Sequence, residues 1–151
     1  MKRGQIKTTQ EIELIAQGGL LLHEILHKTA KLVQSGVSTL DLSNFADAEI
    51  RKVGGVPSFI GYGDKGNEFP AALCTSPNDV VVHGIPSKQE ILQAGDIVGL
   101  DIGMIYKELF TDTAITVPVG AVNAQTQKLI DVTKKSLELG IAAARPGNRM
   151  G

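Results

Sequence analysis

The chain has 151 residues, 42% of them apolar, and a formal net charge of −1. A chain of this length buries roughly 70% of the surface that its unfolded form exposes, so we expect one domain with a hydrophobic core. The balance of 15 basic and 16 acidic residues creates no electrostatic field that would attract nucleic acid or an anionic membrane. We therefore expect neither kind of partner.

The N-terminal region and the single cysteine both indicate a cytoplasmic protein. The stretch after Lys2 and Arg3 stays polar, whereas a signal peptide has an apolar segment there. No apolar run approaches the roughly 20 residues that span a bilayer. Cys74 has no cysteine partner in the chain, which fits a reducing compartment, and we interpret it chiefly as a small buried side chain.

The first predicted element is a helix. Thr8 and Glu11 have the spacing of a capping box, in which each side chain binds the backbone of the other residue. Apolar residues then recur at helical spacing until Gly36. The pattern predicts a helix over residues 9–35.

The rest of the chain predicts a second helix, a set of strands and a third helix. The second helix starts after Ser38, a favourable N-cap residue, and ends at the glycine pair 54–55. Residues 56–119 are rich in Gly, Val, Ile and Thr, with turn residues between short apolar runs, which predicts antiparallel strands. Residues 121–144 return to helical composition. This order predicts an α+β fold in which helices cover one sheet face.

Two aspartates in apolar, β-branched surroundings are the first candidates for a functional site. Asp101 and Asp112 lie eleven positions apart, so a chain reversal near Tyr106 and Lys107 would pair them directly opposite each other on one face. Like charges placed in this way repel, so either one carboxylate keeps a proton or a cation binds both. We favour a divalent metal, which prefers oxygen ligands. A solvated pair is the simpler alternative, and a turn without Asn-Gly leaves the register open by a residue or two.

A histidine is the second candidate. The three valines 80–82 predict a short strand that ends at His83, after which Gly84 and Pro86 turn the chain. A neutral imidazole near a metal-bound water can hydrogen-bond a developing oxyanion or carry a proton. A histidine in a loop is also often merely solvated, so both interpretations stay open.

With both segments considered, the chain resembles the type I methionine aminopeptidases over essentially its whole length. The resemblance rests on residues 78–86, 100–103, 112–114 and 146–149. It implies a metal-dependent enzyme that removes the initiator methionine from the N-terminus of nascent polypeptides. It also implies one half of a pita-bread (creatinase/aminopeptidase-like) fold, with residues 1–151 as a partial catalytic domain made of the N-terminal half and a linking helix.

The same resemblance implies roles for individual residues. Asp101 and Asp112 are similar to metal ligands of the family, whose complete site holds two divalent ions drawn from Mn, Fe, Co or Zn. His83 is similar to the catalytic histidine that contacts the substrate near the scissile bond. The substrate-binding residues that the resemblance implies, including the apolar pocket for the methionine side chain, are Phe59, Tyr62, Phe69, Cys74 and His83.

The chain also departs from the family pattern. The link between Tyr62 and Phe69 is longer than in many relatives, and Thr111 stands where glycine is common. The family completes its metal site with a histidine and two glutamates from later in the chain, whereas this sequence stops at Gly151. We therefore expect the leading part of a longer enzyme that is inactive on its own.

Two other functions stay open. The chain could be a noncatalytic half that dimerises, or that pairs with a C-terminal half, through the surface that such a half would cover. His23, Glu24 and His27 also match H-E-x-x-H, a zinc-protease motif, with Glu49 as the downstream glutamate at a plausible spacing. The preferred interpretation of these histidines is the partly exposed edge of an amphipathic helix that packs on the sheet.

Overall fold

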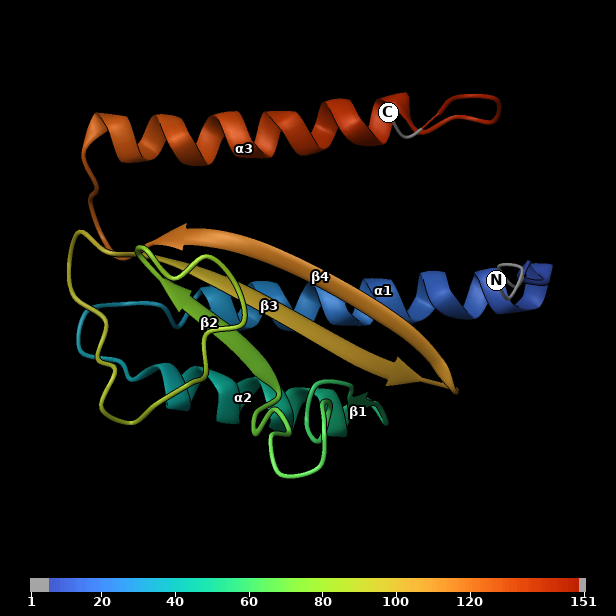
Figure 1. The fold of residues 1–151 in the computed structure, drawn as a ribbon, viewed down its shortest axis with the longest axis horizontal. Helices are drawn as coiled ribbons and strands as arrows, with labels where there is room; N and C mark the ends of the chain where they lie inside the picture. The colour runs from blue at the N-terminus through green and yellow to red at the C-terminus, as the bar shows by residue number, and fades with distance from the viewer. Residues whose placement is uncertain (1–5, 150–151) are drawn as a thin grey trace.

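The computed structural model describes residues 6–149, an antiparallel sheet with helices (Figure 1). The predicted order of helices, strands and helix is confirmed. The outermost parts of the predicted domain, including Lys2 and Arg3, lie outside the described residues. The elements in chain order are α1 (Thr9–Ala30), α2 (Thr39–Lys52), β1 (Val56–Pro57), β2 (Leu73–Pro77), β3 (Ile97–Tyr106), β4 (Leu109–Pro118) and α3 (Ala124–Ala143).

The start of α1 is the predicted capping box. The Thr8 hydroxyl accepts a hydrogen bond from the Glu11 backbone N–H at 3.2 Å, and the Glu11 carboxylate accepts one from the Thr8 N–H at 2.6 Å. The predicted end at residue 35 is wrong, because α1 stops at Ala30. Beyond it the chain tightens into a three-residue turn, in which the Leu32 N–H donates to the Thr29 carbonyl.

The signals at both ends of α2 act as predicted. The Ser38 hydroxyl accepts a hydrogen bond from the Asp41 N–H at 3.1 Å, which satisfies a backbone donor of the first turn. At the other end Gly54 has φ +77°, a left-handed conformation that glycine adopts without steric cost. Local sequence therefore determines where this helix begins and ends.

The strand β3 is the centre of the sheet. β4 pairs with it over its whole length, from Ile97 opposite Pro118 to Tyr106 opposite Leu109. β2 and β1 pair with separate stretches of β3, so they follow one another along its other edge. Every pairing is antiparallel, which confirms the prediction for residues 56–119.

Helices α1 and α2 cover one face of the sheet, as predicted, and the hydrophobic core lies between them and the strands. Gly18 lets α1 approach closely, since a Cβ there would lie 3.2 Å from Tyr106 Cβ and 3.3 Å from Thr111 Cγ2. The core side chains are Leu22, Ile25, Leu26, Leu42, Ala46, Ile50, Leu73, Leu92, Val98, Leu100, Ile102, Met104 and Val119.

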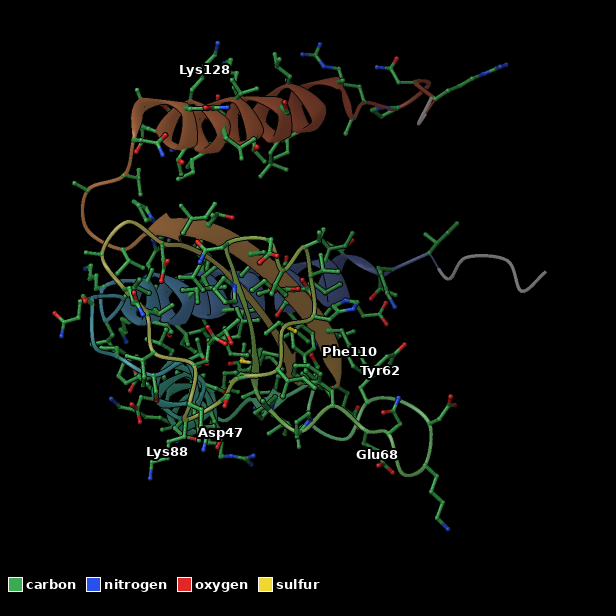
Figure 2. All side chains as sticks on the ribbon, turned by 60° about the vertical axis from the view of Figure 1, so that its left-hand side comes forward. Asp47, Tyr62, Glu68, Lys88, Phe110 and Lys128 are labelled. Atoms are coloured by element: carbon green, nitrogen blue, oxygen red, sulfur yellow. The ribbon has the colours of Figure 1, made fainter. Side chains whose placement is uncertain are left out.

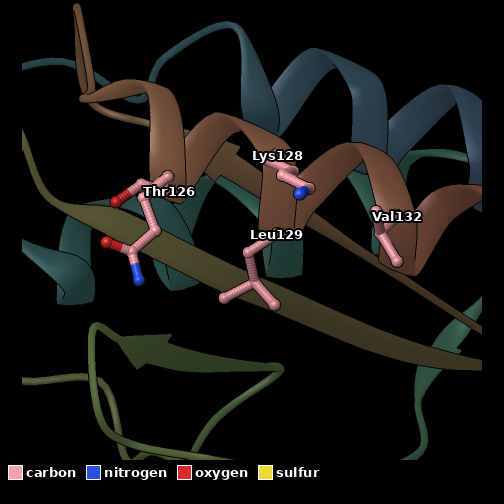
Figure 3. A pocket seen from close by; sticks show the side chains of 5 residues that line it. Thr126, Lys128, Leu129 and Val132 are labelled. Carbon is pink, nitrogen blue, oxygen red and sulfur yellow. The ribbon is translucent and has the colours of Figure 1, made fainter.

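The last helix, α3, has no buried residue and lies apart from the sheet at the top of Figure 1. Most of its large apolar side chains, among them Leu129 and Val132, are exposed. Figure 3 shows these two side chains at a shallow hollow on the helix. Among residues 6–149, no helix combines the length and the apolar character needed to span a membrane.

Candidate metal and substrate site

Asp101 and Asp112 lie on the same face of the sheet but not directly opposite each other. Asp101 pairs with Ala114, and Asp112 pairs with Gly103, so the predicted direct opposition is wrong by two residues. Residues that pair across antiparallel strands share a face, and so do residues two apart on one strand. The carboxylates are therefore diagonal neighbours, a relation in which Cα atoms lie roughly 7–8 Å apart.

The turn between β3 and β4 is the cause of this register. Tyr106 pairs with Leu109, which leaves only Lys107 and Glu108 in the loop, with φ of +50° and +67°. Two positive φ values are the mark of a type I′ turn, whose twist matches that of the flanking strands. The sequence has neither Asn nor Gly here, so this turn carried no local signal.

The face that carries the two aspartates is the one that α1 and α2 leave open. Along β3, the core residues Val98, Leu100, Ile102 and Met104 alternate with the series that contains Asp101. Along β4, Asp112 belongs to the exposed series, while its neighbours Thr111 and Thr113 are partly buried. The two carboxylates therefore face away from the core, where a ligand can reach them.

Both aspartates favour the protonated form more than a free carboxyl group does. Burial raises the pKa of Asp101, the charge of Asp112 raises it further, and His83 opposes the rise. Partial burial also raises the pKa of Asp112, although its side chain keeps access to solvent. A positive charge between the carboxylates would reverse this effect, because it favours their ionised form.

One carboxylate oxygen of Asp101 receives no hydrogen bond from the described residues. Its Oδ1 atom is buried and has no hydrogen-bond partner among them, although a buried polar atom normally has one. On β2, Cys74 pairs with Asp101 and is 3% exposed. Burial first, then the charges of Asp101 and Asp112, raises the pKa of Cys74 to about 12. The thiol thus stays protonated at neutral pH. The carboxylate oxygens are therefore the atoms of this group that suit a divalent ion as ligands.

His83 lies in a loop, not at the end of a strand. The valines at 80–82 are outside β2, and Val81 is 89% exposed, so the predicted strand is wrong. The loop returns along β2, where the Thr75 N–H donates to the Gly84 carbonyl at 2.9 Å. This bond uses the edge of β2 that a further strand would need, and it brings His83 to the residues flanking Cys74.

Asn78, which the sequence analysis did not single out, holds the beginning of this loop. Its φ is +50°, a conformation that asparagine tolerates better than most residues. Its side chain donates to Asp96 Oδ1 at 3.0 Å and accepts from the Ile97 N–H at 3.2 Å. These bonds attach the His83 loop to the start of β3. The Pro-Asn-Asp turn sequence was the only local signal for this role.

Phe59 and Phe69, two of the predicted pocket residues, lie together. Their rings meet edge to face, with centroids 6.3 Å apart and planes at 90°, a favourable arrangement for aromatic pairs. Phe59 also covers Gly103, since a Cβ on that glycine would lie 2.6 Å from Phe59 Cε1. Gly103 pairs with Asp112. An aromatic surface therefore borders the carboxylate pair.

Tyr62 is not part of that aromatic surface. Its side chain is 78% exposed, on a loop that extends away from the helices, together with Glu68 (Figure 2). The loop is closed at its base by two backbone hydrogen bonds, from Gly61 N–H to the Phe69 carbonyl at 2.9 Å and from Phe69 N–H to the Tyr62 carbonyl at 2.8 Å. The longer link between the two aromatic residues is thus an exposed loop.

We expect Gly103→Ala to destabilise the protein by about 1–3 kcal/mol, the usual cost of overpacking. The new methyl group would collide with Ser58 Oγ and with the Phe59 ring. Gly99→Ala is the matched control, because it lies on the same face of the same strand and its Cβ would meet nothing closer than 3.6 Å. Urea unfolding of both variants measures the difference, and equal costs would contradict the assigned role of Phe59.

The H-E-x-x-H motif does not form a protease site. His23, Glu24 and His27 lie on the exposed side of α1, and Glu49 forms ion pairs with Lys28 and Lys52. A catalytic zinc site has three protein ligands. Within residues 6–149, no three metal-binding side chains are grouped in a way that could hold an ion. The preferred interpretation, an exposed edge of an amphipathic helix, is confirmed.

Comparison with known proteins identifies relatives along nearly the whole chain. The family model described as metallopeptidase family M24 matches residues 13–151. A methionine aminopeptidase of Aquifex aeolicus is 41% identical over 149 residues, which are 97% of this chain and 58% of that protein. One of Clostridium acetobutylicum is 42% identical over 145 residues, 96% of this chain and 56% of the relative. The chain thus spans a little over half the length of these curated relatives.

Solved structures agree with the sequence comparison. A methionine aminopeptidase from Thermotoga maritima has a TM-score of 0.92 and 34% identity, and the match covers 97% of this chain and 57% of that one. Aminopeptidase P of Escherichia coli, with a TM-score of 0.77, 20% identity and coverage of 93% of this chain and 30% of that one, shows the same fold. The α+β arrangement described above is therefore shared by these enzymes.

Proposed function

Because the chain belongs to metallopeptidase family M24, with the pita-bread fold of that family, we propose that it is the leading part of a methionine aminopeptidase. It would act on peptides that carry an N-terminal methionine, with nascent polypeptides as the cellular substrate and the cytoplasm as the location. The relatives with about 40% identity bear the name methionine aminopeptidase. We further propose that this chain alone does not catalyse the reaction.

One observation carries the proposal: two carboxylates share the open face of the sheet, and one of them has a buried oxygen without a hydrogen-bond partner among the described residues. Asp101 and Asp112 would hold one or two divalent ions (Mn, Fe, Co or Zn), together with ligands from a second half. When bound, such ions supply Lewis-acid polarisation and activation of water near neutral pH. The charge of the ions would also favour the ionised carboxylates, against the burial and the charge of Asp112 that now raise the pKa of Asp101.

The other residues of the site would bind and orient the substrate. Phe59 and Phe69 would provide apolar surface beside the carboxylates, with Cys74 buried next to Asp101, which suits an unbranched thioether side chain. His83, on the loop held by Asn78 and Gly84, would donate a hydrogen bond to the carbonyl oxygen as negative charge develops there. His83 also opposes the rise in the pKa of Asp101, which supports a position near that carboxylate.

The test is a chimaera that joins this chain to the segment that follows the matched part of the Aquifex aeolicus relative. With Mn²⁺ we expect release of methionine from a methionyl tripeptide, and none from the present chain alone. His83→Gln in the chimaera should lower kcat by about 10²–10⁴, with a smaller change in KM. A folded, metal-loaded chimaera that releases no methionine would overturn the proposal.

A second candidate, a noncatalytic half that associates with another chain, is favoured by a different observation. No residue of α3 is buried, and Leu137, Leu139 and Ile141 are all exposed, although exposed apolar surface of this kind usually has a partner. Sedimentation of the present chain at several concentrations separates the candidates. A concentration-dependent dimer, with no turnover by the chimaera, would support the noncatalytic role.

A further inference from the structure

The strongest feature that the proposed function does not use is the pair His23 and His27 on α1. The two residues are one helical turn apart, and their side chains project from the same side of the helix, as i and i+4 neighbours do. Their rings are 4.2 Å apart between centroids and inclined at 65°. Both residues are exposed, while Leu22, Ile25 and Leu26 hold the opposite side of α1 in the core.

Both imidazoles are available to a ligand. Among the hydrogen bonds and ion pairs of residues 6–149, none involves a side-chain nitrogen of either histidine. Lys28, the cation next to His27 in the chain, is drawn toward α2 by an ion pair of 3.0 Å with Glu49. Glu24 adds a negative charge beside the pair. Two imidazoles at this spacing on a helix are a known way to bind zinc.

We propose that His23 and His27 form a two-imidazole surface site for a divalent transition-metal ion that prefers nitrogen ligands, of which Cu²⁺ binds most tightly. Imidazole suits copper, nickel and zinc, and the affinity of such sites is highest for Cu²⁺. The site has two protein ligands, one fewer than a catalytic zinc site, so we assign it metal binding and not catalysis. It is separate from the carboxylate pair, which lies on the other face of the sheet from α1.

Copper titration of the full chain at pH 7.5, followed by calorimetry and visible absorption, tests this proposal. We expect His23→Gln and His27→Gln each to weaken binding of the first copper ion by at least tenfold. His83→Gln, which removes the third histidine of the chain, and Asp101→Asn, which removes the other candidate metal ligand, should leave that affinity unchanged. Cys74 will not compete as a thiolate, because it is buried and its pKa is raised to about 12.

A rescue variant makes the test specific to geometry. Gly19 lies one turn before His23, and a Cβ added there meets no atom within 4 Å, so Gly19→His fits. Combined with His27→Gln, it rebuilds an i, i+4 pair and should recover most of the lost affinity. Circular dichroism confirms that each variant stays folded. Unchanged affinity in His23→Gln or His27→Gln, loss in His83→Gln, or failure of the rescue would overturn the proposal.

Discussion

In the chimaera, Asp101→Asn should abolish binding of Mn²⁺ or Co²⁺ at the open face of the sheet, and in the present chain without metal it should stabilise the protein at neutral pH. Substitution of residues that merely support metal ligands costs roughly 10–100-fold in affinity, so loss of a ligand should cost at least about 100-fold. The stabilisation follows from the raised pKa values of Asp101 and Asp112, because ionisation is less favourable in the folded protein than in the unfolded chain.

The direction of the pH dependence follows from the same shift. When folding raises the pKa of a carboxyl group, the group does not destabilise the folded protein at a pH below its ordinary pKa, near 3.9, because it is protonated in both states. The folded protein then loses stability as the pH rises from that value through the raised folded pKa of Asp101. Asp101→Asn lacks this titration, so its Tm in EDTA should exceed that of the parent by a few degrees at pH 7, with a smaller difference in acid.

Asp64→Asn is the control for these measurements, because Asp64 is an exposed acidic residue on the loop between Tyr62 and Phe69. It should change neither metal affinity nor Tm appreciably. Calorimetric titration with MnCl₂ measures the affinity, and thermal unfolding in EDTA at several pH values measures the stability. A metal-free Asp101→Asn variant that unfolds at or below the parent's Tm at pH 7 would contradict the destabilisation that burial and the charge of Asp112 impose on ionised Asp101.

Leu100→Ala should destabilise the protein by about 2–5 kcal/mol, the cost of removing a buried leucine and leaving a cavity. Leu100 is 0% exposed and belongs to the core between the helices and β3. Such a loss is a large part of the roughly 5–15 kcal/mol that stabilises most domains. It would also loosen the strand that carries Asp101, the next residue along β3.

Leu129→Ala is the same substitution at a position where the side chain does not pack in the core. Leu129 on α3 is 60% exposed, so its truncation should cost no more than about 0.5 kcal/mol. Urea unfolding compares the two variants, and similar m-values would show that both report stability alone. Equal costs would mean that α3 is packed in solution against a surface that the structure of this chain does not include, such as a second copy.

The helix caps were predictable because their signals are local. Thr8 with Glu11, and Ser38 with Asp41, satisfy backbone donors within three residues along the chain, so no distant partner is needed. The end of α1 was predicted five residues too late, because apolar residues continue at helical spacing beyond Ala30, where the chain already turns.

The site was only partly predictable. The prediction that Asp101 and Asp112 share a face is correct, although the predicted register is wrong by two residues. A shift of two residues keeps each side chain on the same side of the sheet, whereas a shift of one would have moved it to the other side. The valines at 80–82 look like a strand but are exposed, since Gly84 already occupies the edge of β2 where they would pair. Hydrophobic pattern alone does not indicate whether a strand has a neighbour.

The amino-acid sequence by itself determined the order of helices and strands, the helix caps and the acidic pair, because propensity, capping and alternation act over a few neighbouring residues. The tertiary structure decided the β3–β4 register, through a turn of Lys107 and Glu108 with no local preference for positive φ, and the course of the His83 loop. It also decided which surfaces stay open. These features depend on contacts between segments far apart in the chain, such as Gly18 against Thr111, which no short stretch of sequence encodes.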